Sequence, residues 1–180
     1  MEAIELLGLE GAVGHKNIVF STVGDERAFE RLPQGRVKPA LALSLHSTKA
    51  TLRASLLPRA PRIEPAALVA LGERYARDTG YPIQYQWTLI EGVNDGDDEL
   101  DGIVEMLRGK YAIMNMIPYN SVDGLAFKRP SSARAAAMAR ALNQRGVLTK
   151  LRQSAGQDVD AGCGQLRSRA LSAGTRHIPI

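Results

Sequence analysis

Short apolar runs alternate with amphipathic segments along most of this chain, and this alternation limits the fold more than any other feature of the sequence. The runs are typical of strands buried in a parallel sheet. Strands that alternate with helices predict repeated βαβ units, and therefore an α/β fold with a parallel sheet. The expected strands lie at residues 18–20, 39–43, 83–90, 112–117 and 147–152.

The helices are predicted from apolar spacing and from residues that begin or end helices. Asp25, Asp97 or Asp98, and Ser131 or Ser132 are candidate N-caps, because a short polar side chain can accept a hydrogen bond from the first turn. Pro65 suits the first turn of a long helix, and Gly80 suits its end. The expected helices cover residues 1–9, 25–32, 64–78, 98–109 and 131–145.

The length of the chain limits how far such a sheet can close. A chain of 180 residues is long enough for one hydrophobic core. Right-handed crossovers curve a parallel sheet toward a barrel, but a complete eight-fold barrel needs about 250 residues. We therefore expect an open or partial (βα) barrel over residues 1–153, followed by a cysteine-bearing segment and basic tail over residues 154–180.

Composition narrows the cellular context. One cysteine in 180 residues excludes an intrachain disulfide, and the apolar runs are too short to span a bilayer. Residues 1–9 contain Glu2 and Glu5 and lack a basic region before the apolar residues, unlike a signal peptide. A cytoplasmic protein without a membrane partner is therefore expected. The net charge of +4 is uneven, and five cations against two carboxylates give +3 in residues 150–180. That tail suits a polyanion, although a solvated surface tail explains the charge equally well.

Small polar residues follow the apolar runs. In parallel α/β sheets these positions meet at one edge, where ligands bind. Hydroxyl and amide groups there suit a small zwitterionic or ribose-bearing ligand, but each of them could also simply end a strand or cap a helix. The residues concerned are Ser21 and Thr22, Ser44 and His46, Glu91 and Asn94, and Asn120.

His46 is expected to donate or accept a hydrogen bond rather than to bind a metal. The chain contains two other histidines, His15 and His177, and neither has ligand spacing to it. No metal site is predicted from this sequence.

Cys163 lies in the segment Asp158-Val159-Asp160-Ala161-Gly162-Cys163-Gly164-Gln165-Leu166. A lone cysteine is usually a small buried hydrophobe. Here two carboxylates precede it and glycines flank it, which suits a thiol that meets a substrate. The thiolate is the reactive form, so a nucleophilic role needs a base or a cation nearby. Asp158 and Asp160 are expected to support the loop rather than to act as an acid–base pair.

Five segments in this order resemble the C-terminal half of radical S-adenosylmethionine RNA methyltransferases. The group in question methylates C2 of an adenine in 23S ribosomal RNA and, in some members, acts on transfer RNA. The resemblance covers roughly residues 1–170 and is more specific than any one motif. The segments are residues 20–24 (FSTVG), 43–46 (LSLH), 88–95 (TLIEGVND), 117–120 (IPYN) and 158–166 (DVDAGCGQL).

The resemblance implies a radical mechanism, because C2 of adenine is electron-poor and cannot attack a sulfonium methyl group directly. In the family a cysteine first takes a methyl group from S-adenosylmethionine. A deoxyadenosyl radical, made from a second molecule at a [4Fe–4S] cluster, then activates that methyl group for addition to C2. Cys163 matches the methyl-carrying cysteine. Ser21, the segment Ser44-Leu45-His46, and Asn120 match the positions that hold S-adenosylmethionine.

The chain also departs from the family pattern. The three cluster cysteines of a C-x3-C-x2-C loop, a further upstream cysteine, the upstream acidic base, a Gly-Glu-Pro motif and the N-terminal RNA-binding accessory domain are absent from this sequence. The expected fold is therefore a radical-SAM-type partial barrel without its N-terminal cluster-bearing strands. The 180-residue chain alone is expected to be inactive and to self-associate through an exposed sheet edge. The alternative is a non-catalytic remnant that binds S-adenosylmethionine or RNA, or scaffolds a partner. Residues 154–157 (SAGQ), where relatives are more charged, also suit a divergent paralogue.

Overall fold

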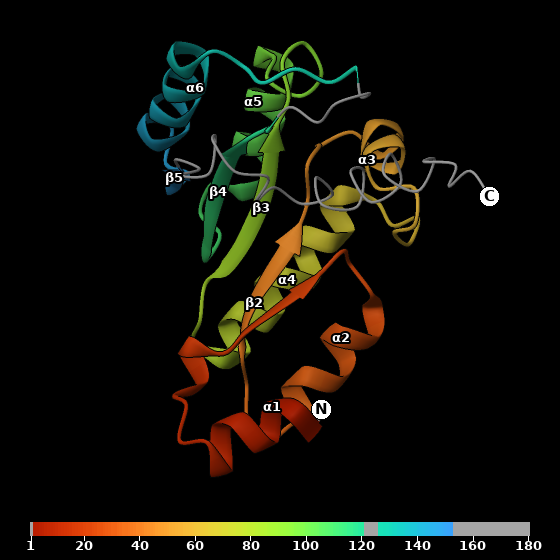
Figure 1. Cartoon of the computed structure of the whole chain (residues 1–180), viewed down its shortest axis with the longest axis vertical. Helices are drawn as coiled ribbons and strands as arrows, with labels where there is room; N and C mark the ends of the chain where they lie inside the picture. The colour runs from red at the N-terminus through yellow and green to blue at the C-terminus, as the bar shows by residue number, and fades with distance from the viewer. Residues whose placement is uncertain (1, 121–125, 153–180) are drawn as a thin grey trace, which may run out of the picture.

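Five parallel strands form a single sheet in a computed structural model of the chain, which describes residues 2–120 and 126–152 (Figure 1). The strands pair in chain order, β1-β2-β3-β4-β5, and every pair is parallel. The strands are β1 (Val19–Thr22), β2 (Ala40–Ser44), β3 (Ile83–Leu89), β4 (Ala112–Pro118) and β5 (Thr149–Leu151).

Helices connect the strands. α1 at the N-terminal end continues into a π-helical turn over Leu6–Glu10, and two short 3-10 turns lie at His15–Asn17 and Leu32–Gln34. The α-helices are α1 (Glu2–Glu5), α2 (Glu26–Arg31), α3 (Ala50–Leu56), α4 (Pro65–Thr79), α5 (Asp97–Leu107) and α6 (Ser132–Gln144).

Two of the predicted caps are confirmed and one is wrong. Asp25 accepts a hydrogen bond from the Arg27 N–H, and Ser131 accepts one from the Arg134 N–H. Asp97 and Asp98 are the first two residues of α5 rather than its cap, because Gly96 takes the N-cap position in extended geometry. The first turn of α5 still carries negative charge, which favours the positive end of the helix dipole.

α3 is the element that sequence analysis missed. The helix has seven residues, and Lys49 at its N-cap makes no side-chain hydrogen bond to its first turn. Without a capping residue or a long apolar period, a segment of this length gives no helical signal.

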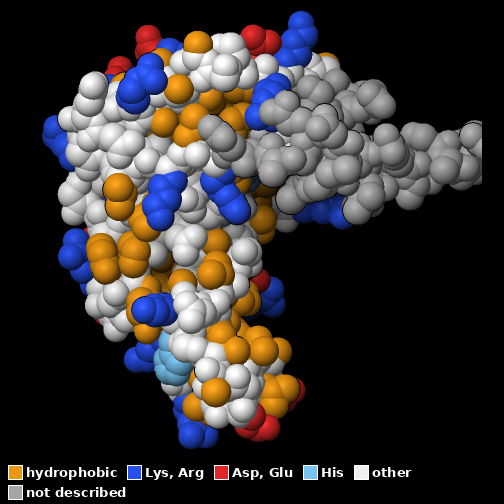
Figure 2. All heavy atoms as spheres, turned by 60° about the vertical axis from the view of Figure 1, so that its left-hand side comes forward, with side chains coloured by type: hydrophobic (Ala, Val, Ile, Leu, Met, Phe, Trp, Pro, Cys, Tyr) orange, Lys and Arg blue, Asp and Glu red, His pale blue; other side chains and the backbone are white. Residues whose placement is uncertain are grey.

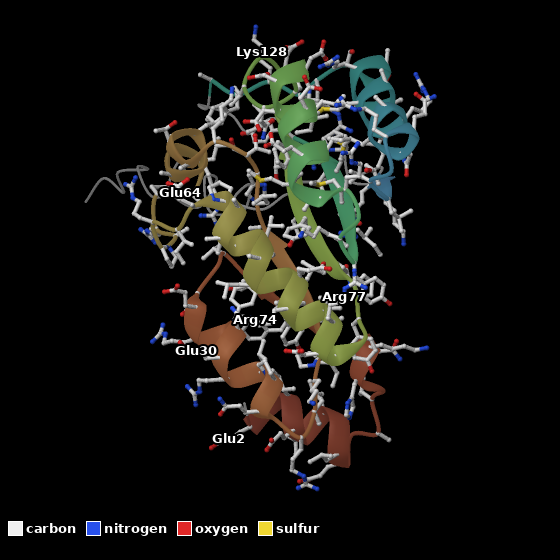
Figure 3. The ribbon with its side chains drawn as sticks, turned by 180° about the vertical axis from the view of Figure 1, so that it is seen from behind. Glu2, Glu30, Glu64, Arg74, Arg77 and Lys128 are labelled. Carbon is white, nitrogen blue, oxygen red and sulfur yellow. The ribbon has the colours of Figure 1, made fainter. Side chains whose placement is uncertain are left out.

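The topology places all the crossover helices on one side of the sheet. Each parallel connection moves the chain one strand further in the same direction, and right-handed connections of that kind put every helix on the same face. α4 and α5 accordingly lie behind the strands in Figure 1 and in front of them in the reverse view of Figure 3. The predicted α/β fold with a curved, partial barrel sheet is confirmed.

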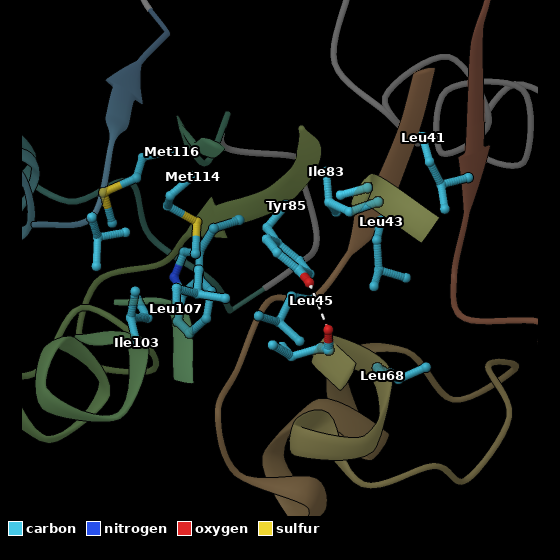
Figure 4. Packing of buried hydrophobic residues seen from close by; sticks show 14 of the residues in the cluster. Leu41, Leu43, Leu45, Leu68, Ile83, Tyr85, Ile103, Leu107, Met114 and Met116 are labelled. Carbon is cyan, nitrogen blue, oxygen red and sulfur yellow. Dashed lines mark hydrogen bonds between the residues drawn. The ribbon is translucent and has the colours of Figure 1, made fainter. Parts of the chain in front are cut away.

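The helix-covered face of the sheet carries the hydrophobic core. Alternate residues of β3 are buried, which is the pattern of a strand covered fully on one face only. Tyr85 points toward α4, and its hydroxyl donates to the Val69 carbonyl oxygen at 3.4 Å (Figure 4). The fully buried side chains of this layer include Leu41, Leu43, Leu68, Ile83, Tyr85, Trp87, Leu89, Ile103, Leu107, Met114 and Met116.

The opposite face of the sheet carries mostly small and polar residues, together with Val19, Ile113 and Ile117. Strand register pairs Ser44 with Gln86, Gln86 with Asn115, and Asn115 with Lys150. Registered neighbours in a parallel sheet project to the same side, so these four residues form one polar row across four strands. α4 and α5 lie on the other side of the sheet from this inner face (Figures 1 and 3). In a barrel it is the face that points inward.

The molecule also exposes apolar side chains at one end. Hydrophobic atoms gather at the lower end in Figure 2, where Figure 1 places α1. Leu6, Leu7 and Leu9 are 43–55% exposed, and Val19 on the edge strand β1 is 49% exposed. These side chains are consistent with the expected self-association, which stays a prediction that light scattering on the purified chain would check.

Candidate functional site

A cleft of about 610 Å³ lies at the carboxyl ends of β1 and β2. Its lining includes Ser21 from β1 and Ser44 from β2, so the structure brings together two residues that are 23 positions apart in the sequence. α2 forms the opposite wall with Asp25, Arg27 and Arg31. Ser21 is exposed and Ser44 is half-buried, so both hydroxyls lie where a ligand can reach them.

Thr22 has a structural role beside this cleft. Its side chain is buried, and its hydroxyl accepts hydrogen bonds from the N–H groups of Gly24 and Asp25. It therefore fixes the turn from β1 into α2, although the residue also lines the cleft. Asp25 in turn binds Arg27, whose Nη2 lies 2.6 Å from Asp25 Oδ2. The hydrogen bond from Arg27 lowers the pKa of Asp25, so this carboxylate is ionised at neutral pH.

Arg53 of α3 connects the ends of the first two strands. Its Nη2 donates to the Val23 carbonyl oxygen at 2.6 Å and to the Ser44 carbonyl oxygen at 3.2 Å. Only 3% of the side chain's surface is exposed, and its Nε has no acceptor within the described part of the chain. Burial lowers its pKa, but a guanidinium starts so high that it stays charged. A buried cation therefore lies beside the cleft.

Leu45 and His46 follow β2 but face different surroundings. The Leu45 side chain is fully buried in the core, so only its backbone could contact a ligand. His46 has a left-handed backbone (φ 60°), and its Nδ1 accepts a hydrogen bond from the Thr88 N–H at 2.9 Å. The prediction of a hydrogen-bonding histidine is confirmed.

His46 is neutral at physiological pH. Burial, followed by the positive charge of Arg53, lowers its pKa to about 4. Because Nδ1 accepts a hydrogen bond, the proton of the neutral ring belongs to Nε2. The residue thus offers one N–H donor at the strand ends.

Asn94 does not belong to the ligand-facing group that the sequence suggested. Its side chain is fully buried. Its Oδ1 accepts from the Ile90 N–H, and its Nδ2 donates to the carbonyl oxygens of His46 and Thr88. The interpretation that strand-end asparagines close turns is therefore correct for this residue. Glu91, by contrast, is exposed at the start of the same turn.

Glu99 is a residue that sequence analysis missed. Although 1% exposed, its carboxylate accepts from the Ser47 hydroxyl at 2.6 Å and from the Thr48 N–H at 2.8 Å, and it also accepts from the Thr48 hydroxyl. It thereby ties the segment after His46 to the first turn of α5. A glutamate near the start of a helix usually faces solvent, so its sequence position carried no signal of this role.

Asn120 follows β4 on the same edge of the sheet. The preceding residue, Tyr119, donates its N–H to the Leu89 carbonyl oxygen at 2.9 Å, so the ends of β3 and β4 stay together. The side chain of Asn120 contacts Arg129, whose Nη1 lies 2.6 Å from Asn120 Oδ1. Ser21, Ser44, His46 and Asn120 therefore succeed one another along the carboxyl edge, and only the first two line the same cleft.

Cys163, with Asp158 and Asp160, lies outside the described residues, and so does the predicted division between residues 153 and 154. Within residues 2–120 and 126–152, no group of three His, Cys, Asp or Glu side chains could hold a metal ion. None of the helices described here has both the length and the apolar composition needed to cross a membrane.

Comparison with known proteins places this arrangement in context. No protein-family model matches the chain. It is 76% identical over 180 residues to a probable RNA methyltransferase of Methylibium petroleiphilum, and 72% identical over 179 residues to one of Aromatoleum aromaticum. These matches cover 100% and 99% of this chain but 51% of each relative. The chain thus spans about half the length of the curated relatives it matches.

Solved structures agree with the fold. A radical SAM methyltransferase from Sphaerobacter thermophilus superposes with a TM-score of 0.81 and 35% identity, over 89% of this chain and 47% of that one. A domain of a pyruvate-formate lyase-activating enzyme from Bacteroides vulgatus superposes with a TM-score of 0.64 at 17% identity, which indicates the fold alone. The chain therefore has a partial barrel of the radical-SAM type. Its whole length is similar to about half the length of each of the two relatives, which are named probable RNA methyltransferases.

Proposed function

We propose that this chain is the part of a radical S-adenosylmethionine RNA methyltransferase that binds S-adenosylmethionine along the carboxyl edge of its sheet. The observation that carries the proposal is the shared cleft of Ser21 and Ser44, the two serines singled out from the sequence. Similarity of the whole chain to about half the length of probable RNA methyltransferases supports an RNA substrate. The proposed target is C2 of an adenine in 23S ribosomal RNA, with transfer RNA as a further candidate.

The described residues fit S-adenosylmethionine. A cleft of about 610 Å³ falls within the range of about 300–1,000 Å³ that small-molecule sites occupy. Its hydroxyl groups suit ribose and carboxylate oxygens, and Arg31, which also lines the cleft, would suit an anionic group of the ligand. His46 adds a neutral N–H donor further along the edge. These groups would bind and orient the ligand.

The residues of this chain do not fit a [4Fe–4S] cluster. Such clusters are held by several cysteine thiolates, and this sequence contains one cysteine. We therefore assign no step at a cluster to these 180 residues. Cluster chemistry, if the complete protein uses it, requires thiolates beyond those of this chain.

Cys163 is proposed to carry the methyl group as S-methylcysteine before its transfer to the adenine. This assignment rests on the resemblance of residues 158–166 to the family motif. A thiolate is the form that accepts a methyl group from a sulfonium, so loading should require a basic or cationic neighbour.

Calorimetric titration of the purified chain with S-adenosylmethionine tests ligand binding. We expect saturable binding that Ser21→Ala and Ser44→Ala each weaken several-fold, with Ser55→Ala on the outer helix α3 as the matched control. Intact mass and peptide mapping would then locate any methyl group on Cys163. Absence of saturable binding would contradict the proposal for this chain.

The substrate is tested with a full-length relative in which the cysteine that matches Cys163 is replaced by alanine. Nucleoside mass spectrometry of 23S ribosomal and transfer RNA should show 2-methyladenosine in the wild type and its loss in the variant of the matched cysteine. Methylation of another base or position would overturn the adenine-C2 assignment and leave ligand binding intact.

A non-catalytic binding module is the second candidate. The observation that favours it is the single cysteine of the sequence. In that case the chain should bind S-adenosylmethionine or RNA fragments with no methyl gain on Cys163, under conditions in which a full-length relative modifies its own cysteine.

A further inference from the structure

The clearest contact between a predicted ligand residue and a charged side chain outside the predicted site joins Asn120 to Arg129. Arg129 Nη1 lies 2.6 Å from Asn120 Oδ1, and the same nitrogen is 3.5 Å from the Tyr119 carbonyl oxygen. Both side chains are half-buried. A hydrogen bond with a charged donor at this distance is among the stronger hydrogen bonds in proteins.

This contact settles which way the Asn120 amide points. Oxygen and nitrogen of an amide side chain have similar shapes, and their placement is decided by their partners. A guanidinium has donors and no acceptor, so only the amide oxygen can face Arg129. The Nδ2 group is therefore directed to the other side.

Asn94 provides a comparison within the same edge of the sheet. All the polar atoms of its amide are used internally, by Ile90, His46 and Thr88. Asn120 instead has its oxygen bound by Arg129, while its Nδ2 contacts no acceptor among residues 2–120 and 126–152. Within the described residues, the amide of Asn120 is thus half satisfied, and its NH2 group has no acceptor.

Arg129 is held in place by its own loop. The N–H of Glu91, in the turn after β3, donates to the carbonyl oxygen of the neighbouring Lys128 at 3.0 Å. Lys128 lies at the top of the view in Figure 3. The loop before α6 is therefore attached to the strand ends at the residue next to Arg129.

We propose that Arg129 is a positioning residue that fixes the Asn120 amide so that its NH2 group faces the ligand. This inference rests on the proposed function and specifies which chemical group the ligand presents there. An NH2 group pairs with an acceptor, such as a ring nitrogen of adenine, a ribose oxygen or a carboxylate oxygen. A group that can only donate, such as an ammonium, is disfavoured at this position.

The test measures S-adenosylmethionine affinity in the 180-residue chain by calorimetry. Asn120→Ala should weaken binding by about tenfold, the size of one lost hydrogen bond of about 1.4 kcal/mol. Arg129→Gln should weaken it by a similar factor, because an amide in place of the guanidinium no longer dictates the orientation of Asn120. Asn120→Asp keeps an oxygen for Arg129 but loses the NH2 donor, so it should bind no better than Asn120→Ala.

A double-mutant cycle separates positioning from general destabilisation. Arg129→Gln combined with Asn120→Ala should bind no worse than Asn120→Ala alone. The matched controls are Arg140→Gln on the exposed side of α6 and Arg134→Gln, whose side chain binds the Asp95 carbonyl oxygen instead. Both controls should keep wild-type affinity. Additive effects in the cycle, or an unchanged affinity in Arg129→Gln, would overturn the inference.

A second readout distinguishes failure of this inference from failure of the proposed function. In ¹⁵N-labelled chain without ligand, Arg129→Gln should shift the side-chain NH2 signals of Asn120 and leave those of Asn94 in place. Absence of S-adenosylmethionine binding in the wild type would overturn the proposed function. In that case the NMR signals of the Asn120 amide still test whether Arg129 positions this side chain. Unchanged Asn120 signals in Arg129→Gln would overturn that positioning role.

Discussion

The two faces of the sheet differ in role: the helix-covered face forms the hydrophobic core, and the inner face carries the polar row. On β3, Tyr85 and Trp87 are at most 1% exposed beneath the helices, while Gln86 between them points to the inner face and is half-buried. The covered face is large and apolar, and the inner face is mostly small and polar apart from Val19, Ile113 and Ile117. Because the helices all lie on one side, the chain can change its inner surface without changing its core. This arrangement suits a fold whose ligands are bound inside the barrel.

The largest expected effect on stability comes from replacing a residue on the helix-covered face of β3. Trp87→Ala should lower the free energy of unfolding by about 3–5 kcal/mol, because it removes the largest fully buried side chain. Chemical denaturation followed by circular dichroism measures the loss. A cost below about 1 kcal/mol would mean that this face is not the core.

Replacement of the buried Glu99 carboxylate is expected to give the next largest loss of stability. Glu99→Gln should lower the free energy of unfolding by about 2–3 kcal/mol, since Ser47 and Thr48 both donate to this carboxylate. Glu105→Gln, at an exposed position of the same helix, is the matched control and should change stability by less than about 0.5 kcal/mol. Equal losses in the two variants would show that the contacts of Glu99 contribute nothing specific.

The pKa of His46 predicts a pH dependence. Its folded-state pKa is about 4 against an ordinary value of 6.5, so the unfolded chain binds the proton more readily. The contribution to stability is present above pH 6.5, declines as the pH falls toward 4, and is on the order of 3 kcal/mol. Histidine ring signals followed by NMR titration give the pKa directly.

The control for this titration removes the imidazole. His46→Gln should flatten the decline in stability between pH 6.5 and 4, while His15→Gln should leave it unchanged. A His46 signal that titrates near 6.5 would contradict the buried, neutral histidine.

Close packing of α4 against β3 predicts a smaller loss of stability when Gly72 is replaced by alanine. A Cβ at Gly72 would lie 2.7 Å from the Tyr85 hydroxyl and 3.3 Å from Ile83 Cγ1. Gly72→Ala should therefore cost about 1–2 kcal/mol in thermal or chemical unfolding, although alanine favours helices. Adding Tyr85→Phe removes the clashing oxygen and should restore part of the loss. A Gly72→Ala chain as stable as the wild type would show that the two elements can separate freely.

The inner face should respond least in stability. Gln86→Ala is expected to cost less than about 1 kcal/mol, because its side chain is half-buried and its Nε2 makes one hydrogen bond, to the Gln84 carbonyl oxygen at 3.2 Å. Comparison with Trp87→Ala under the same denaturant conditions checks this difference. A loss as large as that of Trp87→Ala would remove the distinction between the two faces.

The sequence by itself determined the order and type of most elements. Apolar runs and caps such as Asp25 and Ser131 act over a few residues, and their effects are local. The same local signals failed for α3, which lacks a cap, and for Asp97, which lies one residue inside its helix. The five-motif resemblance also pointed to Ser21 and Ser44 before their shared cleft was known.

Only the tertiary structure decided which polar residues face a ligand and which support the backbone. Asn94 and Asn120 both follow strands. The amide of Asn94 makes hydrogen bonds to three backbone groups, whereas the amide oxygen of Asn120 accepts a hydrogen bond from Arg129. Glu99 is buried because the segment after His46, about 50 positions earlier, folds against it. Hydrogen bonds between residues so far apart depend on how the strands assemble. A pattern that repeats every two or four residues contains no information about them.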